Sequence, residues 1–134
     1  GSPKDLYNFP KNKFVANFIG DANDVTAEII QKQSNTYGLK LAEMNIKIES
    51  NRDLNDKVSL ALRPEKIIIE RTDNSNCIHA KIKSASFVGS SYQYILNSKI
   101  GELYVVSGDT NDIFKVGEEV FLSIDEKDIK ILNE

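Results

Sequence analysis

Hydrophobic and polar residues alternate with a period close to two along most of the chain after Gly20. This pattern is typical of strands that bury one face and expose the other. The predicted strands lie at 25–29, 39–41, 44–48, 58–62, 67–69, 78–82, 85–88, 92–96, 103–106, 120–124 and 129–132. Polar, turn-forming clusters separate many of them, such as 51–56, 73–76 and 108–112. About ten short strands with few helices predict an all-β barrel or sandwich.

The first twenty residues do not follow this alternating pattern. Ser2 and Pro3 suit the N-cap and the first position of a helical turn. Hydrophobic residues recur at helical spacing over 14–19, and Gly20 stands where a C-terminal cap belongs. We therefore expect a short helical segment over 1–20, interpreted as the tail of an upstream domain.

A break at Leu62-Arg63-Pro64 divides the strands into two groups. Proline has no backbone N–H to donate, so Pro64 is expected at a strand end or an edge. We predict two small intertwined parts, 21–63 and 64–134, within one region spanning 21–134. The predicted strands do not alternate with helices, so a parallel, nucleotide-binding sheet is not expected.

Composition narrows the function classes. The 134 residues carry a net charge of −3, with acidic and basic residues interspersed, whereas nucleic-acid-binding domains usually present a basic face. No apolar run approaches the ~20 residues that a membrane-spanning helix needs. The sequence contains neither a G-x-x-x-x-G-K-[ST] phosphate-binding loop nor a G-x-G-x-x-G motif. We therefore expect no enzymatic activity, no bound cofactor and no nucleic-acid partner.

The single cysteine and the single histidine, Cys77 and His79, lie two residues apart on a predicted strand and share a face. Two ligands fall short of the three or four that zinc sites use, so we interpret them as a buried thiol and a half-exposed histidine, with no metal and no catalytic residue predicted. Asp-x-Asn patterns at 21–23, 53–55 and 109–111 lack the glycine of a calcium loop and are interpreted as turns.

Gly89-Ser90-Ser91 lies between two predicted strands. We interpret it as a tight hairpin turn, although amides and hydroxyls in such a turn also suit an oxyanion. Tyr92 and Tyr94 share a strand face, where core or interface packing is favoured over base stacking. Ser90, Ser91, Tyr92 and Tyr94 are the candidate ligand or interface residues.

Three stretches together resemble a known family. Gly1-Ser2-Pro3-Lys4-Asp5-Leu6-Tyr7, Pro10, Phe14-Val15-Ala16-Asn17-Phe18-Ile19-Gly20 and Asn23 are similar to the end of the ATPase domain in ATP-binding subunits of bacterial ABC importers, with Ser2 in place of the family's threonine. Leu62-Arg63-Pro64-Glu65-Lys66-Ile67, and then Ser86 to Tyr94 followed by Gly117-Glu118-Glu119-Val120, resemble the regulatory region beyond it.

The resemblance implies a TOBE-type regulatory domain built from OB-like barrels. In that family such domains contact each other across the ATPase dimer and bind regulators. It also implies that ATP and Mg²⁺ bind the missing ATPase domain, that the partners are a second copy and the permease subunits, and that the protein lies on the cytoplasmic face of the membrane.

Asn23, Arg63, Pro64, Glu65 and Gly89 match positions of the family pattern, and we expect them to be mainly architectural. Arg63 and Glu65 are expected to pair with each other or with backbone, and contact of Arg63 with a partner subunit is the alternative. Ser86 stands where the sugar branch often carries glutamate, which favours the polyamine or iron branch.

Three functions remain open at the level of sequence. The first is a non-catalytic regulatory and dimerisation domain of an importer subunit. The second is a sensor of a small solute or oxyanion in the same transporter. The third is an OB-fold nucleic-acid binder, which the composition disfavours.

Overall fold

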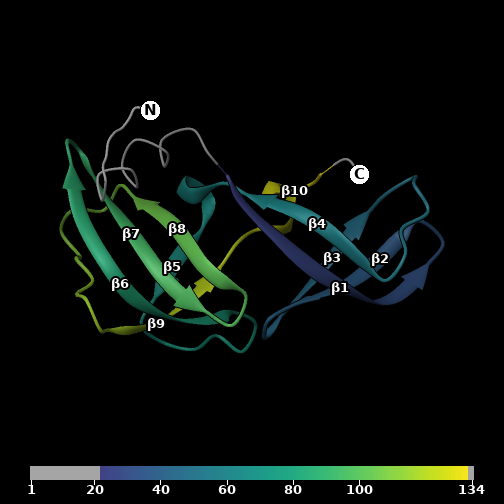
Figure 1. The fold of residues 1–134 in the computed structure, drawn as a ribbon, viewed down its shortest axis with the longest axis horizontal. Coiled ribbons are helices and arrows are strands. Elements are labelled where there is room, and N and C mark those ends of the chain that lie inside the picture. Colours follow the sequence, from purple (N-terminus) through teal and green to yellow (C-terminus); the bar gives the residue numbers. More distant parts are fainter. Residues whose placement is uncertain (1–21, 133–134) are drawn as a thin grey trace.

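Ten strands form two five-stranded antiparallel sheets in the computed structural model, which describes residues 22–132 (Figure 1). Sheet A has the order β10-β4-β1-β2-β3, and sheet B has the order β5-β9-β6-β7-β8. The strands of sheet A are β1 (Asn23–Gln33), β2 (Thr36–Leu41), β3 (Met44–Glu49), β4 (Lys57–Leu62) and β10 (Ile129–Ile131). Those of sheet B are β5 (Ile68–Glu70), β6 (Ile78–Val88), β7 (Ser91–Ser98), β8 (Gly101–Ser107) and β9 (Glu119–Ser123). The all-β prediction is confirmed.

Helical structure within residues 22–132 is limited to two single 3-10 turns, η1 (Pro64–Lys66) and η2 (Glu126–Asp128). Pro64 begins η1 directly after β4, at a strand end as its missing N–H requires. The helical segment predicted over 1–20 lies outside the described residues. No described helix has the length and apolar character needed to cross a membrane.

The two sheets repeat one topology. In each, four consecutive strands take the spatial order 4-1-2-3 of a Greek key, as β4-β1-β2-β3 and as β9-β6-β7-β8. A 3-10 turn then leads to a fifth strand that joins the opposite sheet: β5 pairs with β9, and β10 pairs with β4. If the two halves are taken as β1–β5 and β6–β10, each half completes the sheet of the other half.

The longest strand of each sheet contains a register shift, between Ile29 and Gln31 in β1 and between Ile82 and Ser84 in β6. Such an irregularity adds a residue to one strand and changes which residues face inward. In β6 the inward positions are even-numbered up to Ile82, whereas Ala85 faces inward beyond it, opposite the buried Tyr94. This change of phase explains why the sequence predicted two strands, 78–82 and 85–88, where the structure has one.

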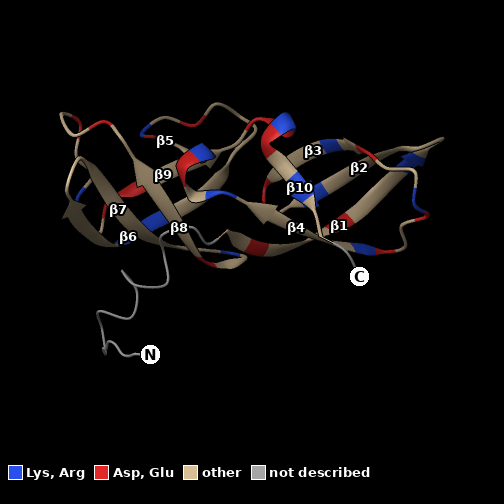
Figure 2. Cartoon of the chain, turned by 90° about the horizontal axis from the view of Figure 1, so that it is seen from above, with Lys and Arg blue, Asp and Glu red and all other residues tan. Residues whose placement is uncertain are grey.

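A single hydrophobic core joins both sheets. Its fully buried leucines come from strands of each half, among them Leu39, Leu60, Leu96 and Leu122. Burying one such side chain stabilises a fold by about 1.5–3 kcal/mol. The outer surface mixes charges of both signs over both sheets, with no continuous basic stripe on the coloured part of the chain (Figure 2).

Candidate functional site

Asn23 joins the two sheets. It is buried at the start of β1, where its side-chain N–H donates to the Leu62 carbonyl (3.1 Å) and the Tyr104 carbonyl (2.9 Å). Its side-chain oxygen accepts from the Tyr104 N–H (2.7 Å). The amide of Asn23 thus connects β1 and β4 of sheet A with β8 of sheet B, and both its nitrogen and its oxygen have hydrogen-bond partners.

The Arg63-Pro64-Glu65 segment forms the exit from β4. The Arg63 guanidinium contacts the Glu65 carboxylate at 2.6 Å, and this contact lowers the pKa of Glu65 more than partial burial raises it. Both side chains are about half exposed, so the pair is a surface ion pair of small energy. Pro64 between them is buried, and η1 packs against β8. The segment directs the chain from sheet A into sheet B.

Gly89 and Ser90 form the two-residue turn between β6 and β7, since Val88 pairs directly with Ser91. Gly89 has a φ of 69°, a conformation that suits glycine in the first central position of such a turn. An added Cβ there would meet nothing within 4 Å, so the turn projects into open space. The hairpin interpretation is confirmed, while binding of an oxyanion by the turn stays a prediction.

An aromatic row runs inward from this hairpin. Phe87 is 57% exposed, and its ring lies 5.2 Å from that of Tyr92. Tyr92 stacks on Tyr94 at 5.9 Å, and Tyr94 meets the edge of Phe114 at 5.7 Å. Tyr94 is fully buried and therefore presents no face to a base or a solute. Only the outer end of the row, Phe87 with the half-buried Tyr92, is accessible.

Arg71 closes the inner end of the row. Its guanidinium lies 4.2 Å from the Phe114 ring centroid and contacts the carboxylates of Asp112 (2.7 Å) and Glu118 (2.5 Å). The Tyr94 hydroxyl accepts from the Phe114 N–H at 3.1 Å. These contacts fix the long loop between β8 and β9 against sheet B. No local pattern in the sequence distinguishes Arg71, because its partners are distant in the chain.

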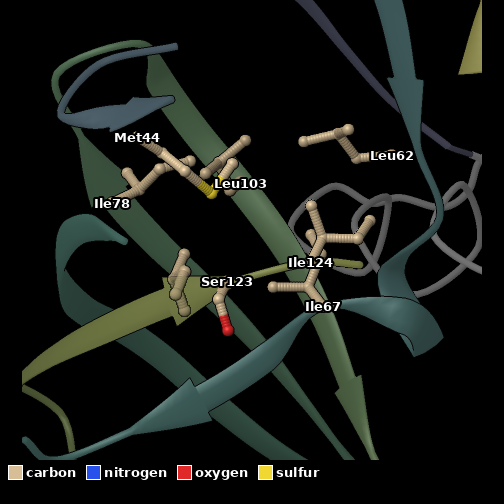
Figure 3. A pocket seen from close by; sticks show the side chains of 8 residues that line it. Met44, Leu62, Ile67, Ile78, Leu103, Ser123 and Ile124 are labelled. Carbon is tan, nitrogen blue, oxygen red and sulfur yellow. The ribbon is translucent and has the colours of Figure 1, made fainter. Parts of the chain in front are cut away.

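The seam between the sheets contains a small apolar cavity of about 10 Å³ (Figure 3). Its lining is Met44, Leu62, Ile67, Ile78, Leu103, Leu122, Ser123 and Ile124. This volume is at the lower limit for a single water, and a water also needs polar partners. The cavity is a packing defect of the core rather than a ligand site.

Cys77 and His79 are joined by a third potential metal ligand, Asp73, which lies in the cluster 73–76 that the sequence predicts as a turn. One ligand atom from each of the three lies within 4.8 Å of those of the others. Burial, and then the hydrogen bond to Asp73, raise the pKa of the Cys77 thiol above its ordinary value of 9.0. In this state the thiol is protonated at neutral pH and is a poor nucleophile.

Relatives of the chain are ATP-binding proteins of importers. The Fe(3+) ions import ATP-binding protein FbpC of Agrobacterium fabrum is 23% identical over 99% of this chain. The spermidine/putrescine import ATP-binding protein PotA of Mesomycoplasma hyopneumoniae is 34% identical over 97% of this chain. The matches cover 37% and 28% of those proteins, so the chain spans about a third of the length of these relatives.

A solved structure shares the fold. The cytoplasmic molybdate-binding protein ModG, with molybdate bound, superposes with a TM-score of 0.66 over 84% of this chain and 96% of that one, at 9% identity. The family model described as the TOBE domain matches residues 60–132, which include all of sheet B and reach back into β4 and β10 of sheet A. Because this family model matches more than half of the 134 residues, the chain belongs to the TOBE domain family.

Proposed function

We propose that the chain is the non-catalytic regulatory and dimerisation domain of the ATP-binding subunit of an ABC importer for iron or polyamines. The observation that supports this best is the extent of the matches. Nearly the whole chain aligns with import ATP-binding proteins, yet it accounts for only about a third of them. ATP and Mg²⁺ would then bind elsewhere in the subunit, since this sequence has no phosphate-binding loop.

The mechanism proposed is mechanical. Two copies would hold the ATPase halves of a transporter in register beneath the permease subunits, on the cytoplasmic face of the membrane. A regulator that prefers one arrangement of the copies would shift the catalytic cycle towards it. That shift is limited to the regulator's difference in affinity between the two arrangements.

The accessible end of the aromatic row is the surface we propose for self-association. Phe87 is a large aromatic residue with 57% of its surface exposed, and its ring contacts that of the half-buried Tyr92 at 5.2 Å between centroids. Buried aromatic side chains provide much of the binding energy in protein interfaces. Ile30 of sheet A is exposed to a similar extent (58%) but has no aromatic neighbour in the described contacts, which makes it a matched control.

Sedimentation equilibrium across a concentration series tests the proposal. We expect a reversible dimer whose dissociation constant rises at least tenfold in Phe87→Ser and changes little in Ile30→Ser. A strict monomer at all concentrations would contradict self-association by this chain. If neither variant changed the dimer, the proposed function would stand, but the interface would lie on another surface.

The oxyanion-sensor alternative is tested separately by calorimetry. Titrations with molybdate, sulfate, phosphate and spermidine are performed on the chain and on a Ser90→Ala, Ser91→Ala variant. Saturable heat that the double substitution abolishes would support binding at the hairpin turn. Heats of dilution alone for every solute would exclude it.

A further inference from the structure

The side chains of Asp73, Cys77 and His79 converge at the start of β6, on the side of sheet B that faces away from the core. The Cys77 thiol donates to the Asp73 carboxylate at 3.1 Å, and the other Asp73 oxygen lies 3.5 Å from His79 Nε2. This grouping is the richest in metal-binding atoms within residues 22–132. It lies apart from the hairpin turn of β6 and β7 and from the packing seam.

Local chain geometry produces the cluster. His79 lies on the outward face of β6, and Cys77 lies in the bend directly before that strand. The loop before β6 folds back over this face: the Asp73 carboxylate accepts from the Ser75 N–H at 2.8 Å, as in an Asx turn. Cys77 is thereby covered to 3% exposure, whereas His79 and Asp73 remain about half exposed.

The separations suit one metal ion. In a tetrahedral zinc site, bond lengths of about 2.3 Å to sulfur and about 2.0–2.1 Å to nitrogen and oxygen place neighbouring ligand atoms roughly 3.3–3.5 Å apart. One Asp73 oxygen lies 3.1 Å from the Cys77 sulfur and the other lies 3.5 Å from His79 Nε2, both close to that spacing. The three ligand atoms all lie within 4.8 Å of one another, so a small approach of the side chains places them around one ion. A thiolate and a carboxylate with a neutral imidazole carry two negative charges, which match a divalent cation.

The site also has an open side. An open groove beside the cluster is lined by Asp73, His79, Lys81, Asn97, Glu119 and Phe121, among others. The His79 ring is held edge-on to Phe121 at 4.9 Å between centroids, so one contact besides Asp73 orients the imidazole. Three protein ligands with one solvent-accessible position is the arrangement that zinc adopts when it keeps an exchangeable ligand.

We propose that Asp73, Cys77 and His79 bind a borderline-soft divalent metal ion of the zinc class. The ion replaces the thiol proton, which is released to solvent, and it leaves one coordination position open to water. No described contact of the proposed dimerisation surface involves these residues, so the site stands or falls independently of that function.

The expected consequence is a stiffer joint between the sheets. Asn76, inside the same loop, accepts from the Asn45 N–H (2.7 Å) and donates to the Asn45 carbonyl (3.2 Å), which ties the loop to β3. Glu43, in the β2–β3 turn, accepts from the His79 N–H at 3.3 Å. Figure 1 shows this loop, in teal, beside the β2–β3 turn of the other sheet. A metal ion would fasten the loop at its sheet B end.

Cobalt spectroscopy gives the sharpest test, because the chain has one cysteine and one histidine. The reduced, untagged chain is titrated with Co²⁺, and Zn²⁺ is then added in competition with a chromogenic chelator. We expect one ion per chain, intense visible bands of tetrahedral cobalt, and a near-ultraviolet charge-transfer band from Cys77. Zn²⁺ should abolish both signals and raise the melting temperature.

Matched variants assign the ligands. Cys77→Ser should remove the charge-transfer band, and His79→Gln, at an exposed position, should weaken zinc binding about 100-fold or more. Asp73→Asn keeps a turn-forming side chain but loses the anionic ligand. Asp109→Asn is its control, because Asp109 also accepts from two backbone N–H groups (3.0 and 3.3 Å) in a remote turn.

Weak, octahedral cobalt spectra without a thiolate band in the unaltered chain would overturn the proposal. Equal zinc affinity in the unaltered chain and in His79→Gln would overturn it as well. Circular dichroism of each variant distinguishes loss of a ligand from loss of the fold.

Discussion

The two sheets have the same topology but hold their long loops differently. In sheet A, the hydroxyl of the buried Tyr37 donates to the Arg52 carbonyl (2.9 Å) and accepts from the Leu54 N–H (3.1 Å) in the β3–β4 loop. In sheet B, the hydroxyl of the buried Tyr94 accepts from the Phe114 N–H in the β8–β9 loop. Each half therefore uses one core tyrosine to fix the loop that leads into its fourth strand.

The surroundings of the two tyrosines differ in charge and burial. A lysine, Lys32, lies 5.4 Å from the Tyr37 ring and contacts Asp53, whose side chain is 84% exposed. Arg71 occupies the corresponding role in sheet B, with two carboxylates and the Phe114 ring around it. The loop of sheet B is thus held by a cation with two carboxylate partners, and the loop of sheet A by a cation with one carboxylate partner, which is largely exposed.

The exchange of fifth strands makes the two halves interdependent. β5, the last strand of the first half (β1–β5), completes sheet B, and β10, the last strand of the second half (β6–β10), completes sheet A. Neither sheet has all of its strands without the other half of the chain. We therefore expect one cooperative unfolding transition for both sheets, although their strands form two separate backbone ladders.

The largest effect is expected from breaking the joint at Asn23. In Asn23→Ala the N–H and C=O of Tyr104 and the Leu62 carbonyl lose their amide partner in a poorly hydrated place. Leaving such groups unsatisfied should lower the free energy of unfolding by about 2–3 kcal/mol. Urea denaturation, followed by circular dichroism and tyrosine fluorescence, measures the loss.

Asn97→Ala, at an exposed position of β7, is the matched control and should change stability by less than about 0.5 kcal/mol. If the two probes gave separate transitions in the Asn23 variant, the sheets would be shown to unfold independently once the joint is removed. A loss no greater than that of the control would mean that the buried amide does not hold the sheets together.

The tyrosine pair tests the difference between the loops. Tyr94→Phe leaves the N–H of the buried Phe114 without its acceptor and should cost about 1–2 kcal/mol. Tyr37→Phe removes two hydrogen bonds, but Leu54 is only half-buried and water can replace the hydroxyl, so about 0.5–1 kcal/mol is expected. The two variants are compared by denaturant unfolding, and the reverse ranking would contradict the view that burial decides the cost.

The sequence is sufficient to predict most of the strands and the position of Pro64 at a strand end, because these depend on local periodicity and on proline's missing donor. It does not reveal that the two halves share a topology, since the repeat lies in strand order and pairing. Val25 to Ile29 and Ile78 to Ile82 occupy equivalent strands without being recognisably similar.

The cluster of Asp73, Cys77 and His79 could likewise be predicted only in part from the sequence. The spacing of Cys77 and His79 predicts that they share a face, yet the third member of the cluster depends on a loop conformation that periodicity does not describe. Asp73 and Asp109 each accept a hydrogen bond from the N–H two residues further on, and both form turns. Only the position of the first turn, over the outer face of β6, brings its carboxylate to the thiol and the imidazole.

The smallest effect on stability is expected for the ion pairs of Arg71, beside the Phe114 ring, and of Lys32, beside the Tyr37 ring. Hydrogen bonding from the Lys115 N–H, and then from Arg71, lowers the pKa of Glu118 below its ordinary value of 4.5. A carboxyl group with a depressed pKa in the folded state contributes stability that is present above about pH 4.5 and is lost as the pH falls through the lower, folded-state value. Arg71→Gln removes the second of these causes, so the pKa of Glu118 should move back towards 4.5.

The difference in stability between the unaltered chain and Arg71→Gln should therefore be constant above about pH 5.5 and should shrink as the pH falls below 4.5. Lys32→Gln is the counterpart in sheet A. Asp53 also has a lowered pKa, caused by Lys32, but the pair is exposed and screened by salt. Unfolding measured from pH 3 to pH 7 at low and high salt separates the two. If the effect of Arg71→Gln disappeared in salt as readily as that of Lys32→Gln, the two carboxylate contacts of Arg71 would hold their loop no better than the single pair beside Tyr37.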